Sequence, residues 1–176
     1  LSTPDDFVKN TGIAAKTRSL TYLVGAAPVS RFEVADAAAF QAFFERAATE
    51  SGVAFQTKQL ANHSYQVYSL NELLDGLELL VSVDRGWGTV ALHNSKLPEA
   101  HRAQALAQQK PAQHLGNSSK LADISKKYQL KQDGLGFFST EQLGLAFTTA
   151  EGNQLAKDLQ LVFTAGLPEQ LQIWHT

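Results

Sequence analysis

Two adjacent apolar segments joined by a two-residue turn constrain this chain more than any other feature. Residues 77–84 (LELLVSVD) and 87–93 (WGTVALH) alternate as strands do. Arg85-Gly86 lies between them, and Gly86 can adopt the positive φ that tight hairpin turns require. One face of the first segment is apolar throughout, and Leu80 makes its other face partly apolar as well. The pattern therefore predicts a hairpin with a strand that is covered on both sides.

Shorter segments rich in β-branched and aromatic residues extend this sheet. A second hairpin is expected, with Asn62, His63 and Ser64 in its turn. Because tight hairpins pair their strands antiparallel, the sequence predicts an antiparallel sheet of about five to six strands. The further segments expected to be strands are residues 19–24, 29–34, 53–60, 65–70 and 134–139.

The clearest predicted helix covers residues 37–50. Asp36 is a suitable N-cap, and Gly52 stands where a left-handed C-cap is expected. One apolar stripe at helical spacing contains Phe40, Phe43, Phe44 and Ala47. We expect an α+β fold with the helices packed on one face of the sheet. The other predicted helices are residues 5–10, 98–109, 120–128, 140–147 and 152–165.

The length of 176 residues fits a single α+β domain spanning 1–176, with residues 150–176 as a candidate C-terminal helical appendage. The chain begins at Leu1 and contains no Met, so we interpret it as a fragment of a longer protein. The absence of Cys excludes disulfides, thiolate metal sites and cysteine catalysis. We expect no transmembrane segment, since no apolar stretch approaches about 20 residues.

The charge and the glycine spacing argue against two further classes of protein. Fifteen Lys and Arg against seventeen Asp and Glu leave a net charge of −2, and a nucleic-acid binder usually carries a basic face. The short glycine motifs Gly86-Trp87-Gly88 and Gly134-Leu135-Gly136 do not continue into a dinucleotide or P-loop fingerprint. We therefore predict no nucleic-acid partner and no cofactor.

No catalytic or metal-binding constellation is evident. No pair among the five His has the spacing of a zinc site, and His93, His101 and Glu99 would converge only through a favourable turn. Ser139 stands between a predicted strand and helix but lacks the glycines of a nucleophile elbow. We expect a protein that is not an enzyme. The alternative is a hydrolase with a Ser/His site assembled in space, which convergence of His93, His101 and a carboxylate would favour.

Aromatic residues on the predicted strands are the remaining candidates for ligand binding. Tyr65, Tyr68 and Trp87 can line a groove for a ligand or partner. The competing and favoured interpretation is that they are core residues and cross-strand pairs.

The segment from Tyr22 to Phe43 (YLVGAAPVSRFEVADAAAFQAF) resembles the N-terminal part of an uncharacterised family of bacterial envelope proteins. The resemblance continues through Tyr65–Tyr68, the paired strands from Leu77 to Leu92, and Gly134–Phe138, and covers residues 18–147. It implies a periplasmic or lipoprotein-type location and a larger parent protein, with a cytoplasmic location as the alternative. It implies no activity. Our leading hypothesis is a non-enzymatic domain that binds a partner protein, an envelope component or a small ligand, and a purely structural domain is a further alternative.

Overall fold

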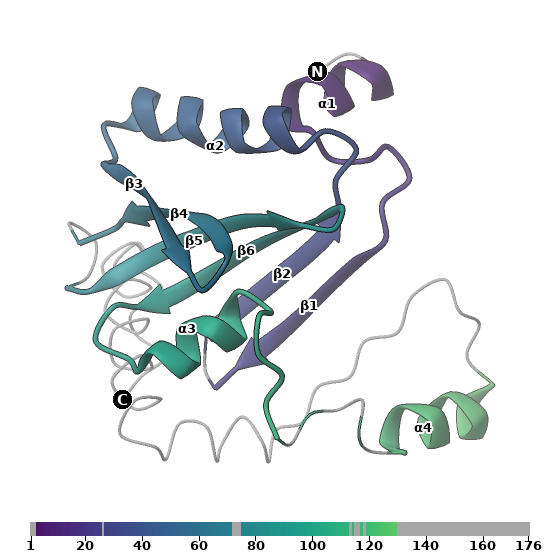
Figure 1. Ribbon diagram of the computed structural model, residues 1–176. Helices are drawn as coiled ribbons and strands as arrows, with labels where there is room; N and C mark the ends of the chain where they lie inside the picture. Colours follow the sequence, from purple (N-terminus) through teal and green to yellow (C-terminus); the bar gives the residue numbers. More distant parts are fainter. Residues whose placement is uncertain are drawn as a thin grey trace, which may run out of the picture.

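The computed structural model describes residues 3–25, 27–71, 75–112, 114, 117 and 119–129. These residues form one six-stranded antiparallel sheet, in the order β1-β2-β6-β5-β4-β3, with four helices (Figure 1). The predicted α+β fold is confirmed. The strands are β1 (Ser19–Val24), β2 (Ala27–Glu33), β3 (Phe55–Leu60), β4 (His63–Ser69), β5 (Leu77–Asp84) and β6 (Trp87–Asn94).

Several predicted features lie outside the described residues. They are the strand at 134–139, the helices at 140–147 and 152–165, the appendage at 150–176, and Ser139.

The hairpin predicted for residues 77–84 and 87–93 is formed by β5 and β6. Arg85 and Gly86 both have positive φ, 48° and 77°, as a tight two-residue turn requires. The β3–β4 hairpin also forms, but its turn lies one residue earlier than predicted. Ala61 takes the positive φ of 51°, and His63 is already the first residue of β4.

Strand β2 begins at Ala27, two residues before the predicted start, and so contains Pro28. Pro28 lies opposite Leu23 of β1, while the pairing of β2 with β6 begins only at Val29. A proline without an N–H is tolerated at a strand end where the ladder does not need a donor.

Helix α2 (Ala37–Ser51) has the predicted caps, and the side chain of Asp36 accepts a hydrogen bond from the Ala39 N–H. Phe40 is fully buried, but Phe43 is 37% exposed. The side of α2 that faces the sheet is narrower than the predicted stripe, and at the end of the helix Ala48 is buried.

The helices cover both faces of the sheet, which differs from the prediction that they pack on one face. Helix α2 lies on one side and α3 (Glu99–Ala105) on the other (Figure 1). Buried apolar side chains of the central strands lie on both faces, with Val81 on one and Leu80 on the other, so each face needs cover. On the α2 face, Phe40 and Ala48 pack with Tyr68 and Val81.

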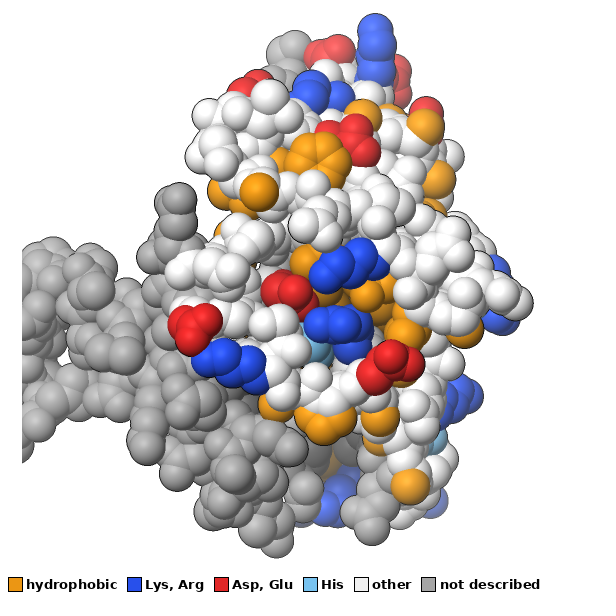
Figure 2. Space-filling model, turned by 60° about the vertical axis from the view of Figure 1, so that its left-hand side comes forward, with side chains coloured by type: hydrophobic (Ala, Val, Ile, Leu, Met, Phe, Trp, Pro, Cys, Tyr) orange, Lys and Arg blue, Asp and Glu red, His pale blue; other side chains and the backbone are white. Residues whose placement is uncertain are grey.

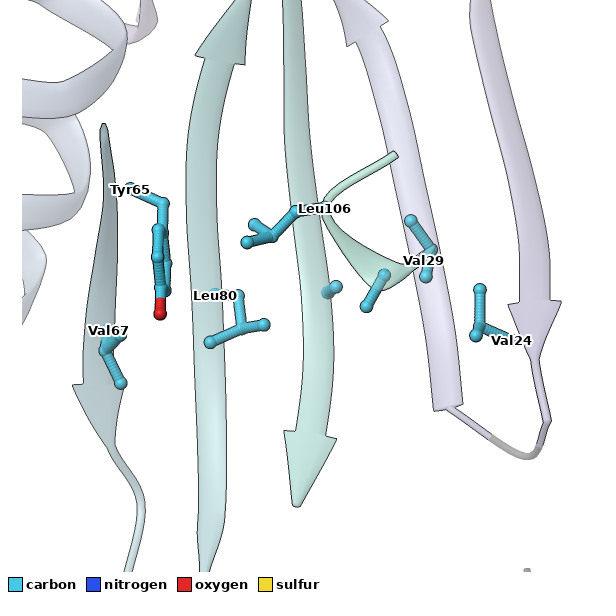
Figure 3. Packing of buried hydrophobic residues seen from close by; sticks show 8 residues of the cluster. Val24, Val29, Tyr65, Val67, Leu80 and Leu106 are labelled. Atoms are coloured by element: carbon cyan, nitrogen blue, oxygen red, sulfur yellow. The ribbon is translucent and has the colours of Figure 1, made fainter. Parts of the chain in front are cut away.

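The α3 face holds the second hydrophobic cluster (Figure 3). Leu80 at its centre is fully buried, as expected for a strand covered on both sides. Helix α3 ends four residues before the predicted end, because the chain turns at Ala107, whose φ is 58°. The buried members of the cluster are Val24, Val29, Tyr65, Val67, Leu80, Ala91, Ala105 and Leu106.

Two further helices lie outside these layers. Helix α1 (Pro4–Thr11) begins with a capping box between Thr3 and Asp6 and packs against α2. Helix α4 is Lys120–Tyr128, as predicted. Among the helices of the described residues, none has both the length and the apolar character needed to cross a membrane.

Candidate functional site

A cluster of charged and histidine side chains lies on the α3 face of the sheet. Glu78 of β5 and His93 of β6 are direct cross-strand partners. Helix α3 adds His101 and Arg102. The Oε2 atom of Glu78 lies 3.1 Å from Nη2 of Arg102 and 3.4 Å from Nδ1 of His93. The rings of His93 and His101 are 5.8 Å apart between centroids. We call these four residues the Glu78 cluster.

The local structure explains why these residues meet. Side chains two residues apart on a strand share a face, so Glu78 shares the face of Leu80, and His93 that of Ala91. Helix α3 starts after Pro98, which cannot extend a strand, and its first turns pass over that face. His93, His101 and a carboxylate thus converge. This is the arrangement that we expected to favour the hydrolase alternative.

The electrostatic environment keeps Glu78 ionised. Burial raises the pKa of its carboxyl, but the neighbouring His93 ring and the charges of Arg102 and Lys58 outweigh burial and hold this pKa below its ordinary value. Only 11% of the Glu78 side chain is exposed, and none of His93. A buried carboxylate of this kind needs compensating partners, which α3 supplies.

Nδ1 and Nε2 of His93 and Nε of Arg102 are buried without a hydrogen-bond partner among the described residues. The Nδ1 atom still lies 3.4 Å from Oε2 of Glu78, whereas Nε2 forms no ion pair with any residue that the structure describes. Buried polar groups are nearly always paired with protein, water or a ligand. The described residues supply no hydrogen-bond partner for Nε2 of His93.

Lys58 of β3 contributes a second permanent positive charge. It acts on Glu78 electrostatically, yet it makes no salt bridge within 4.0 Å to any residue that the structure describes. Figure 2 shows basic side chains beside an acidic side chain and a histidine in the middle of the face that it draws. Two permanent positive charges, on Lys58 and Arg102, thus act on the single carboxylate of Glu78.

Within the described ranges there is no group of three or more His, Cys, Asp or Glu that could hold a metal ion. Ser82 is on the same strand face as Glu78 and has a buried Oγ without a hydrogen-bond partner among the described residues. It pairs with Thr89, however, four residues along β6 from His93, so it is not positioned as a nucleophile for that base.

The three aromatic candidates for ligand binding lie in different environments. Tyr65 and Tyr68 are both 3% exposed and belong to the clusters on opposite faces, which is the core interpretation. Trp87 is half-buried at the start of β6. The guanidinium carbons of Arg18 and Arg31 lie 5.7 and 5.6 Å from its ring centroid. Its ring is thus occupied by cation–π contacts within the domain.

The sequence interpretation missed Glu78 and Arg102. A signal existed for Glu78, because a glutamate in LELLVSVD, a segment predicted to be covered on both sides, must have a buried partner. No local signal distinguished Arg102, whose partner lies 24 residues away in the chain.

Comparison of the chain with protein-family models, with curated proteins and with solved structures gives no match in any of the three. The function must therefore be inferred from the residues of the Glu78 cluster and their surroundings.

Proposed function

We propose that this chain is a non-enzymatic binding domain of the bacterial cell envelope that takes an anionic group at the Glu78 cluster and Lys58. The observation that carries the proposal is the pair of permanent positive charges, on Lys58 and Arg102, that acts on the single carboxylate of Glu78. A carboxylate or phosphate group attracted by Lys58 and Arg102 can accept hydrogen bonds from these two side chains. The group belongs to an envelope component, a partner protein or a small ligand, which share this chemistry.

The periplasmic or lipoprotein-type location is part of the same proposal. It is supported by the resemblance carried by Tyr22–Phe43 and the paired strands of β5 and β6. Reading the coding sequence upstream of Leu1 tests it. A leader followed by a lipidation Cys supports an anchored envelope protein, and an uninterrupted cytoplasmic domain upstream contradicts it.

Titration with inorganic phosphate and with acetate tests the binding site. The readout is the nuclear magnetic resonance signal of the His93 ring. We expect saturable shifts in the wild type and binding weakened about two- to fivefold in Lys58→Gln, the usual range for losing one exposed charge pair. Lys96→Gln is the matched control, because Lys96 is exposed and pairs with Asp75 outside the cluster. Absence of any His93 shift, or equal affinity in the wild type and Lys58→Gln, contradicts the proposal.

A hydrolase is the second candidate, and the convergence of His93, His101 and Glu78 favours it. Two features weigh against it. A general base must reach its substrate, but His93 has no exposed surface. Glu78 is engaged by Arg102, which gives the cluster the character of a buried ion pair. Turnover of ester or phosphoester substrates that His93→Gln abolishes, with the fold retained, would establish the hydrolase.

A further inference from the structure

Strand β1 is an edge strand of the described sheet, and its sequence lacks the residues that usually prevent pairing at an edge. It ends the sheet order, and Ser19, Leu20, Thr21 and Leu23 are exposed. Leu20 and Leu23 keep 55% and 44% of their surface accessible. Natural edge strands usually carry a charge, a proline or a bulge that prevents association. The opposite edge strand, β3, carries Lys58, whereas β1 (SLTYLV) has neither a charged residue nor a proline.

The hydrogen-bond pattern shows which backbone groups of β1 are available. The N–H of Glu33 donates to the carbonyl of Arg18 at 3.1 Å, so Arg18 faces β2. In an antiparallel pair, residues alternate between facing their partner strand and facing away. The backbone groups of Ser19, Thr21 and Leu23 therefore point away from β2, and no strand of the described residues lies on that side.

We propose that β1 pairs antiparallel with β1 of a second copy of this chain, about a two-fold axis at Thr21. In this register Thr21 lies opposite Thr21 of the partner subunit, and Ser19 opposite the partner's Leu23. On the α3 side, Leu20 packs against the partner's Tyr22. The two six-stranded sheets then continue into one sheet across the dimer.

Self-complementarity favours a second copy over a foreign strand. A two-fold interface must match itself, and here the same register brings an exposed Leu against a Tyr twice. No charged residue stands opposite another, because β1 has none. An uncharged edge also offers nothing to select an acidic or basic foreign segment. The interface does not involve Lys58 or Arg102, so it is independent of the proposed anion site.

Sedimentation velocity of the full chain over a range of concentrations tests the dimer. We expect the wild type to shift from monomer to a species of twice the mass as its concentration rises. Thr21→Lys places two like charges face to face on the axis and should abolish the shift, and Thr21→Glu should do the same. Thr57→Lys is the matched control, since it adds the same charge to an exposed Thr on the other edge strand and should leave the dimer intact.

A mixture of Thr21→Lys and Thr21→Glu provides the decisive measurement, because opposite charges on the axis should restore the dimer while each variant alone stays monomeric. Circular dichroism checks that each variant folds. A wild type that remains monomeric at every concentration overturns the proposal. A dimer that survives in Thr21→Lys also overturns it, since another surface must then hold the copies together.

Discussion

Nδ1 of His93 lies 3.4 Å from Oε2 of Glu78, across the two central strands and beneath α3. Arg102 contacts the same carboxylate oxygen from α3, at 3.1 Å. One carboxylate thus joins two strands to the helix that covers them. The stability of this side of the domain should therefore depend on the ionisation of Glu78.

The first prediction concerns the acid side of the stability profile. The pKa of Glu78 is lowered in the folded state, so its contribution is complete above its unfolded pKa of about 4.3 and is lost as the pH falls through the lower folded pKa. We expect the free energy of unfolding to fall more steeply below about pH 4.3 in the wild type than in Glu78→Gln. Urea unfolding at a series of pH values measures this. Glu99→Gln, an exposed change on α3, controls for net charge, and parallel profiles for wild type and Glu78→Gln would contradict the prediction.

The second prediction separates backbone strain from steric exclusion at two helix ends. Gly12 and Gly52 cap α1 and α2 with nearly equal φ, 70° and 69°. A Cβ on Gly12 would lie 2.3 Å from the Asp36 carbonyl oxygen and 2.4 Å from the Phe40 nitrogen, whereas one on Gly52 meets nothing within 4 Å. Alanine at Gly52 should cost about 1–2 kcal/mol from the left-handed conformation alone.

Alanine at Gly12 must carry the same strain and also displace backbone atoms, which adds about 1–3 kcal/mol for an overpacked site. The free energies of unfolding of Gly12→Ala and Gly52→Ala, measured side by side, check the order. Equal losses of the free energy of unfolding in the two variants would show that the backbone of Asp36 and Phe40 moves away from the added Cβ at no cost.

The features that could be predicted from the sequence are those set by neighbours in the chain. The β5–β6 hairpin follows from alternation and from Arg85-Gly86, and α2 follows from Asp36 and Gly52 at its ends. The Glu78 cluster could not be assembled in this way. It joins a strand to a helix whose residues come 24 positions later, and nothing local specifies that α3 crosses the face opposite to α2.

The third prediction tests which phenylalanine side chains of α2 are buried. Helical spacing treats Phe40 and Phe43 alike, but Phe40 is fully buried and Phe43 is 37% exposed. Phe40→Ala should cost about 3–5 kcal/mol, because it leaves a cavity against Phe32 and Phe44. Phe43→Ala should cost clearly less, since water fills the space. Thermal or urea unfolding of both variants measures the difference, and a loss at Phe43 equal to that at Phe40 would mean that Phe43 is covered in solution.

The fourth prediction concerns alkaline pH on the α2 face. Burial and the charge of Glu45 raise the pKa of Tyr68 to about 12, while its hydroxyl donates to Oε1 of Gln66 at 2.8 Å. Because an unfolded tyrosine has a pKa of about 10, the folded state retains this proton longer, and stability should fall as the pH rises from about 10 towards 12.

Tyr68→Phe keeps the aromatic ring that packs against Phe44 and Phe55 but removes the ionisable group. We therefore expect the alkaline loss of stability to be smaller in this variant than in the wild type. Subtracting its ultraviolet tyrosinate titration from that of the wild type should leave one transition near pH 12. Tyr128→Phe, at a residue that is 61% exposed, is the matched control for removing one hydroxyl. A Tyr68 difference transition near pH 10 would show that water reaches this hydroxyl in the folded protein and that the contact of α2 with β4 is looser than the structure indicates.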